Sequence, residues 1–99
     1  MKHIVIDLEM NPVDWSYRDV RRHMHEEVIE KVIRFAGELN FIIKGLTFSP
    51  VKGPEGNIEY LLYIEKSEAK QDEAGISDIL NDVKKVVKEA ENTLNKGEE

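Results

Sequence analysis

Three carboxylates are the residues of this sequence whose types and spacing suggest chemistry. Asp7 and Glu9 stand two apart in "HIVIDLEM", and Glu59 lies at the start of "IEYLLYIEK". Residues two apart in a strand share a face, and an antiparallel third strand would bring Glu59 beside the end of the first. Three such carboxylates suit Mg²⁺ or Mn²⁺, which prefer oxygen ligands. The alternative is three solvated acids on an exposed face.

A basic segment is the second group with possible chemistry. It contains Arg18, Arg21, Arg22, His23 and His25. The three arginines suit phosphate, so an RNA contact is one hypothesis, but a net charge of −6 disfavours it and favours a solvated helix face. The two histidines point about 200° apart on a helix, so they cannot share a metal ion. We interpret both of them, and His3, as surface residues.

The bulk composition indicates one small globular domain. The chain has 99 residues and no cysteine, which excludes disulfides and thiolate metal sites and fits an intracellular protein. No apolar run approaches the roughly 20 residues of a membrane span, and the acidic N-terminus does not resemble a signal peptide. We therefore expect a cytoplasmic protein without a membrane partner.

Alternation and helical spacing predict the elements that position these residues. Residues 3–10 and 58–66 alternate, and residues 41–48 are β-branched and aromatic, so we predict three strands. A helix over about 16–39 has an apolar stripe of Val20, Met24, Val28, Val32, Phe35 and Ala36, widened by Ile29, Ile33 and Leu39. Asn40 suits the left-handed residue that ends a helix.

A polar linker over 67–75 precedes the final helix, predicted over 76–97 with Ser77 as its N-cap. Its apolar stripe contains Ile79, Leu80, Val83, Val86, Val87, Ala90 and Leu94. The order is therefore β-α-β-β-α, an α/β fold. The helix between the first two strands makes them parallel, and the connection "SPVKGPEGN" makes the last two antiparallel. In that loop we expect Gly53 and Gly56 to permit positive φ.

From His25 onward the sequence resembles the C-terminal part of the hemolysin-A (TlyA) family of FtsJ-like methyltransferases. The resemblance lies in "FAGELNF" and "SPVKGPEGNIEYLLYIEK", and it covers about residues 25–95. These enzymes methylate ribose 2′-hydroxyls of ribosomal RNA. The resemblance implies a partial Rossmann-like fold, with a three-stranded mixed sheet in which the last strand inserts between the other two, giving the order 1-3-2.

The resemblance also implies a role for Glu59, which matches the glutamate of the family's Lys-Asp-Lys-Glu catalytic tetrad. Asp7 stands about where the second lysine would be. The other two tetrad residues and the S-adenosylmethionine loop belong to segments without a counterpart here. We therefore expect no complete methyl transfer by this chain and no certain cofactor.

The first strand resembles a different family. "HIVIDLEMNP" is similar to the opening strand of DEDD-type 3′–5′ exonucleases, whose Asp-x-Glu pair binds two metal ions; here the pair is Asp7 and Glu9. The two resemblances together suggest a chimera, with residues 1–25 exonuclease-like and residues 26–66 methyltransferase-like. A metal-binding nuclease remnant acting through Asp7, Glu9 and Glu59 is the alternative function.

Two helices can cover one face of a three-stranded sheet, so the other face should be partly bare. That face would carry Val5, Leu61 and Tyr63, with Ile43 as a further candidate. Bare apolar patches and open strand edges are typical of partner surfaces. We therefore predict a homodimer formed through the open sheet face or a sheet edge.

Overall fold

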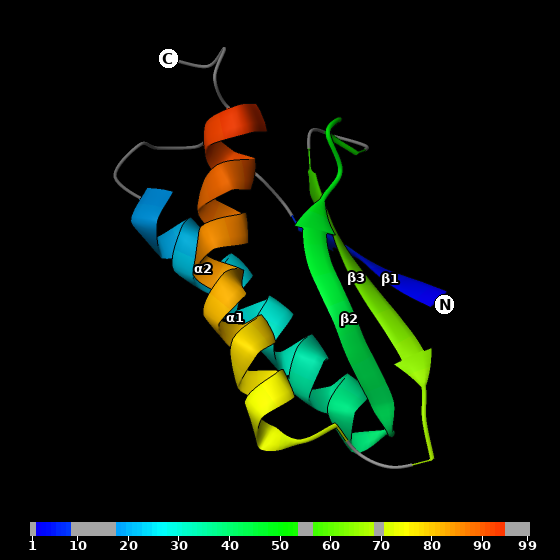
Figure 1. The fold of residues 1–99 in the computed structure, drawn as a ribbon. Helices are drawn as coiled ribbons and strands as arrows, with labels where there is room; N and C mark the ends of the chain where they lie inside the picture. Colours follow the sequence, from blue (N-terminus) through cyan, green and yellow to red (C-terminus); the bar gives the residue numbers. More distant parts are fainter. Residues whose placement is uncertain (1, 9–17, 54–56, 69–70, 95–99) are drawn as a thin grey trace.

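The structure, a computed structural model, describes residues 2–8, 18–53, 57–68 and 71–94. The elements follow the order β1 (Lys2–Leu8), α1 (Arg18–Glu38), β2 (Phe41–Phe48), β3 (Ile58–Lys66) and α2 (Glu73–Leu94). Figure 1 shows both helices on the same side of the sheet, which gives a two-layer α/β arrangement. The predicted β-α-β-β-α order is confirmed, and the ranges of the second and third strands match those of β2 and β3.

The sheet has the spatial order β1-β3-β2, as predicted. β3 pairs antiparallel with both neighbours, so β1 and β2 run in the same direction without pairing with each other. The description of the sheet as mixed is therefore corrected, because both of its ladders are antiparallel. A register shift between Ile43 and Gly45 marks a bulge in β2. A Cβ on Gly45 would meet nothing within 4 Å, so this glycine serves no close approach.

β3 is the centre of the hydrophobic core. Its burial alternates, with one face fully buried or nearly so at Ile58, Tyr60, Leu62 and Ile64. Core residues from the other elements are Ile6, Ile29, Ile33, Ala36, Ile43, Val83, Val87 and Ala90. Ile43 thus belongs to the core, and its suggested place on the bare face is wrong. The opposite face of the sheet carries exposed Val5 and half-buried Leu61 and Tyr63, as expected.

The buried side of α1 is not centred on the apolar stripe that we expected to face the core. Ile29 and Ile33, which we expected only to widen the stripe, are fully buried, and Ala36 is buried with them. The exposed apolar residues of the helix, 38–62% exposed, are Met24, Val28, Phe35 and Leu39. Phe35, for example, is 62% exposed. Apolar residues occupy more than half of the helix circumference, so their spacing alone does not identify the side that meets the sheet.

The C-terminal end of α1 is fixed by Asn40, which has φ 64° and confirms the expected left-handed residue. Its N–H donates to the carbonyl of Gly37 at 3.1 Å, and its own carbonyl accepts the N–H of Ser67 at 2.9 Å. The Lys66 ammonium donates to the carbonyl of Leu39 at 2.9 Å. This corner therefore joins the end of α1 to the end of β3.

We expect Asn40→Ala to lower the free energy of unfolding by about 1 kcal/mol, because a Cβ without a compensating polar group strains the left-handed conformation. Asn40→Gly should be as stable as the parent or slightly more stable, since glycine adopts this φ freely. Urea unfolding of the three proteins checks the prediction. Equal losses in both variants would show that the Asn40 side chain, rather than its φ, is what matters.

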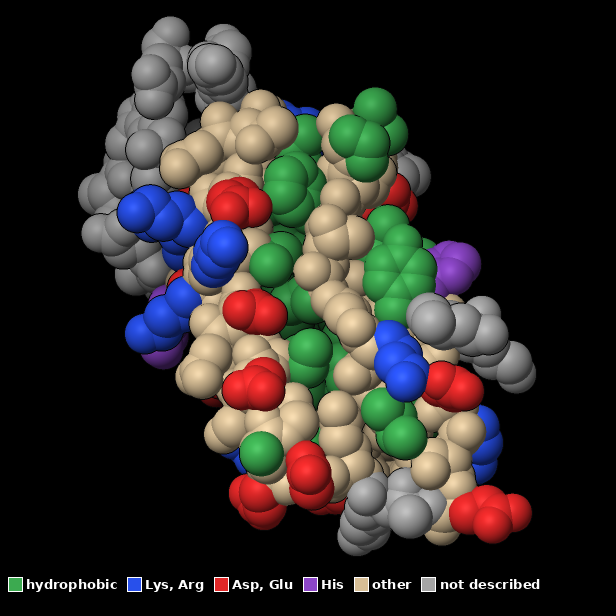
Figure 2. All heavy atoms as spheres, in the orientation of Figure 1, with side chains coloured by type: hydrophobic (Ala, Val, Ile, Leu, Met, Phe, Trp, Pro, Cys, Tyr) green, Lys and Arg blue, Asp and Glu red, His purple; other side chains and the backbone are tan. Residues whose placement is uncertain are grey.

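α2 begins earlier than predicted, at Glu73 rather than near Ser77. The Asp72 carboxylate accepts the N–H of Gly75 at 2.8 Å, and the Asp72 carbonyl accepts the N–H of Ile76 at 3.1 Å. Asp72 is therefore the N-cap, and part of the predicted linker is helical. The predicted apolar stripe of α2 faces the core, and Figure 2 shows charged side chains along the outer side of α2 beside hydrophobic ones between α2 and β2.

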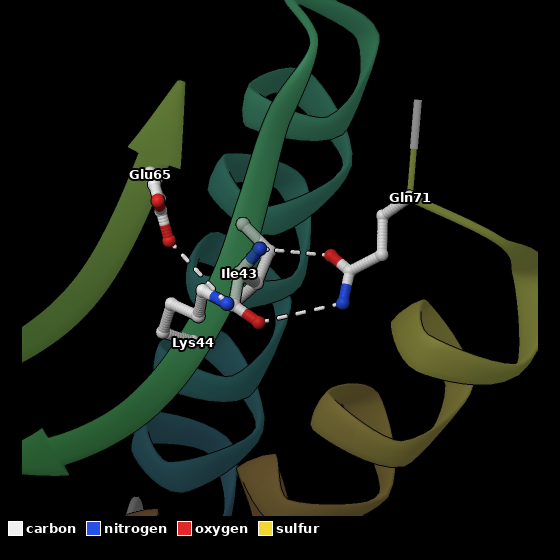
Figure 3. Close-up of polar contacts among 4 residues, drawn as sticks. All are labelled: Ile43, Lys44, Glu65 and Gln71. Carbon is white, nitrogen blue, oxygen red and sulfur yellow. Dashed lines mark hydrogen bonds and ion pairs between the residues drawn. The ribbon is translucent and has the colours of Figure 1, made fainter. Parts of the chain in front are cut away.

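Gln71 closes the outer edge of β2 (Figure 3). The N–H of Ile43 donates to Gln71 Oε1 at 2.8 Å, and Gln71 Nε2 donates to the carbonyl of Ile43 at 3.4 Å. One side-chain amide thus satisfies the two backbone groups that another strand would otherwise pair with. Lys44 forms an ion pair with Glu65 across the bulge at 3.4 Å.

Candidate functional site

The carboxylate of Glu59 lies against the loop that precedes β3. A Cβ built on Gly53 would stand 2.9 Å from both Cδ and Oε2 of Glu59. The loop folds back through two backbone hydrogen bonds, from Ser49 N to the carbonyl of Glu59 and from Gly53 N to the carbonyl of Asn57, each 2.8 Å long. A side chain at position 53 would therefore displace the Glu59 carboxylate from its position.

We expected Gly53 to adopt a positive φ. This prediction is wrong, because the φ of Gly53 lies outside the left-handed range. Gly56 lies outside the described residues.

Asp7 is the direct cross-strand partner of Glu59 in the β1–β3 ladder. The structure therefore brings together two of the three predicted metal ligands, Asp7 exposed and Glu59 half-buried, on the sheet face opposite the helices. Glu9 lies outside the described residues. Within the described ranges no group of three or more His, Cys, Asp or Glu side chains could hold a metal ion. The Mg²⁺ or Mn²⁺ site stays a prediction that depends on Glu9.

Two like charges opposite each other on neighbouring strands destabilise a sheet. Without divalent ions, we expect Asp7→Asn to raise the free energy of unfolding by about 0.2–1 kcal/mol. Millimolar Mg²⁺ should raise the Tm of the parent and leave that of Asp7→Asn unchanged, because a ligand that binds only the folded state stabilises it. Thermal unfolding in EDTA and in Mg²⁺ measures both effects.

Asp78→Asn, the same change at an exposed aspartate of α2, is the matched control for this experiment. An equal response of the parent and both variants to Mg²⁺ would contradict a site at Asp7.

The three candidate RNA-contacting arginines lie in the first turns of α1. The side chains of Arg18 and Arg21 lie outside the described part of the structure. Arg22 turns toward α2, where its Nε lies 3.1 Å from Oε2 of Glu91, although the two atoms are not aligned as a hydrogen bond. Arg22 is thus engaged within the protein, and phosphate contact by this group stays a prediction.

A buried polar cluster between the helices and β3 was missed by sequence reasoning. His25 is 4% exposed, which corrects its interpretation as a surface residue; its Nδ1 lies 3.3 Å from the Tyr60 hydroxyl. The two rings also meet edge to face. Glu91 is 3% exposed beside Arg22. The available signal was the spacing of His25 from Ile29, one helical turn along the buried side.

Exposure of the other two histidines agrees with the prediction, since both His3 and His23 are exposed. In the described part of the chain, neither helix is long and apolar enough to cross a membrane.

No family model matches the chain. The chain is 35% identical over 71 residues to "Putative rRNA methyltransferase YqxC" of Bacillus subtilis, a match that covers 72% of this chain and 25% of that protein. Among solved structures, "Putative hemolysin from Streptococcus thermophilus" matches 97% of this chain and 35% of its own, with 31% identity and a TM-score of 0.69.

The chain thus spans about a quarter to a third of the length of these proteins. The exonuclease-like reading of the first strand is not tested by these matches and stays a prediction. Over most of its length, this chain is a relative of the C-terminal segment of the hemolysin-A (TlyA) family of FtsJ-like rRNA methyltransferases.

Proposed function

We propose that this chain forms the C-terminal segment of an rRNA 2′-O-methyltransferase-like fold and contributes Glu59 to it, without transferring methyl groups by itself. The likeness to a protein named as an rRNA methyltransferase, of which this chain covers 25%, supports the first part. The second part rests on the resemblance, which places the S-adenosylmethionine loop and most of the tetrad in other segments. A cytoplasmic location, where ribosomal RNA is found, is part of this proposal.

The observation that carries the proposal is the position of Glu59. Its carboxylate is held beside Gly53 at the loop end of β3 and lies on the sheet face opposite the helices. A carboxylate in such a position can accept a hydrogen bond from a hydroxyl group, and that contact orients the hydroxyl or receives its proton. The ribose 2′-hydroxyl is the group that the resemblance implies as the acceptor of the methyl group.

The test is a chimera in which this chain replaces the matching segment of the Bacillus subtilis relative. The assay measures transfer of labelled methyl from S-adenosylmethionine to ribosomal RNA. We expect transfer by the chimera, a loss of at least about 100-fold in its Glu59→Gln variant, and none by this chain alone. The relative itself is assayed in parallel, so that the comparison starts from a measured activity.

Glu65→Gln is the matched control, because Glu65 lies on the same face of β3 and pairs with Lys44 at the other end of the strand. The chimera that carries Glu65→Gln should keep the methyl-transfer activity of the unsubstituted chimera. Methyl transfer by the isolated chain would overturn the non-catalytic part of the proposal, and an active Glu59→Gln chimera would overturn the role of Glu59.

A further inference from the structure

The missing side chain of Gly53 leaves room for one particular neighbour. The three atoms nearest to a Cβ built on Gly53 are Cδ, Oε2 and Cγ of Glu59, at 2.9, 2.9 and 3.0 Å. Two of these distances are shorter than real Cβ atoms show, so an alanine at position 53 would force a movement. Because all three atoms belong to Glu59, the space beside Gly53 is space for the Glu59 carboxylate.

The backbone conformation of Gly53 gives no second reason for a glycine. Its φ lies outside the left-handed range, so an alanine can adopt the same φ without strain. What an alanine cannot do is leave the Glu59 carboxylate where it lies. The position therefore selects glycine through the side chain of Glu59 and not through the path of the chain.

The loop backbone is held more firmly than the carboxylate. The N–H of Ser49 donates to the carbonyl of Glu59, and the N–H of Gly53 donates to the carbonyl of Asn57, each at 2.8 Å. Moving Gly53 away from β3 would break the second of these hydrogen bonds. The end of a glutamate side chain, in contrast, turns about its own single bonds at small cost. A Cβ at position 53 should therefore displace the carboxylate and leave the fold intact.

Asp7 makes a displaced carboxylate less favourable on the side of β1. Asp7 is the cross-strand partner of Glu59, and both side chains lie on the sheet face opposite the helices. Like charges directly opposite each other on two strands repel. A Glu59 carboxylate that leaves Gly53 therefore gains no alternative partner in Asp7.

We propose that Gly53 is a positioning residue, whose missing Cβ sets the place in which the Glu59 carboxylate meets the hydroxyl of the substrate. The inference rests on the proposed function of Glu59 and adds to it the residue that places the carboxylate. Its contacts lie within residues 49–59 of this chain, so they do not depend on the segments that the relatives have in addition.

The first experiment places Gly53→Ala in the chimera with the Bacillus subtilis relative. A displacement of about 1 Å at a reacting group can cost about 100-fold in rate, so we expect kcat to fall about 10- to 100-fold. KM should stay within about twofold, because Gly53 is not proposed to bind the RNA. Gly45→Ala is the matched control and should keep kcat, since a Cβ on Gly45 meets nothing within 4 Å.

The second experiment uses this chain alone and needs no activity. The Tm of Gly53→Ala should be no lower than that of the parent, because alanine reduces the freedom of the unfolded chain. NMR couplings that report the side-chain rotamers of Glu59 should change in Gly53→Ala and stay unchanged in Gly45→Ala. A loss of rate without a loss of stability separates positioning of the carboxylate from a merely structural role of the glycine.

The outcomes separate this inference from the proposed function. If the Glu59→Gln chimera is inactive but Gly53→Ala keeps its kcat, the role of Gly53 is wrong and that of Glu59 stands. Equal losses of kcat in Gly53→Ala and Gly45→Ala, or unchanged Glu59 rotamers in Gly53→Ala, would also overturn the inference. An active Glu59→Gln chimera would overturn the proposed function, and the role of Gly53 with it.

Discussion

Leu62→Ala is expected to lower the free energy of unfolding by about 2–5 kcal/mol, the usual cost of truncating a fully buried leucine. Leu62 is 0% exposed at the middle of β3, opposite Ile4 of β1 and Leu46 of β2. The substitution therefore opens a cavity where all three strands meet, and the surrounding side chains can close it only in part. A domain of this size has a total stability of about 5–15 kcal/mol, so the loss is a large fraction of it.

The measurement is thermal and urea unfolding, and the Tm should fall by about 8 °C or more. Leu39→Ala is the matched control, because Leu39 is 46% exposed at the end of α1 and loses little buried surface. Similar losses for both leucines would mean that β3 is not the centre of the core.

Glu91→Leu should cost about 2–3 kcal/mol through loss of the ion pair with Arg22. The carboxylate is buried in the interface between the two helices, where its Oε2 lies 3.1 Å from Arg22 Nε. Removing one partner of a buried pair leaves the other charge partly desolvated, at a cost of about 3–5 kcal/mol when burial is complete. We expect less here because the Arg22 side chain is 30% exposed and water reaches it.

A double-mutant cycle separates this electrostatic effect from packing. The double variant Arg22→Met with Glu91→Leu replaces the pair by apolar side chains and should lie within about 1 kcal/mol of the parent. Urea unfolding of the parent, the two single variants and the double variant gives the coupling energy. Strictly additive losses would show that the two residues are not coupled.

The candidate site could be predicted in part from the sequence. Alternation placed Asp7 on the outward side of the first strand, and the antiparallel third strand placed Glu59 beside it; the ladder confirms that pair. The contact between Glu59 and Gly53 could not be foreseen, because it depends on how the loop folds back over β3. The path of this loop depends on hydrogen bonds between its two sides, from Ser49 to Glu59 and from Gly53 to Asn57, which the alternation of a strand does not encode.

The sequence by itself determined the three strands, the buried faces of β1 and β3, and the residue that ends α1. The alternation of a strand places Ile58, Tyr60 and Leu62 on one face, whatever the strand packs against. Asn40 adopts a left-handed conformation that few residues tolerate. These features are local, since each follows from the geometry of the backbone.

Tertiary structure alone decided which side of α1 is buried. α1 has apolar residues on two adjoining sides, and contact with α2 and the sheet selected Ile29 and Ile33 while it left Phe35 exposed. The same packing buried His25 against Tyr60 and Glu91 against Arg22. Burial of a polar residue requires a partner from another element, so only the assembled layers could reveal it.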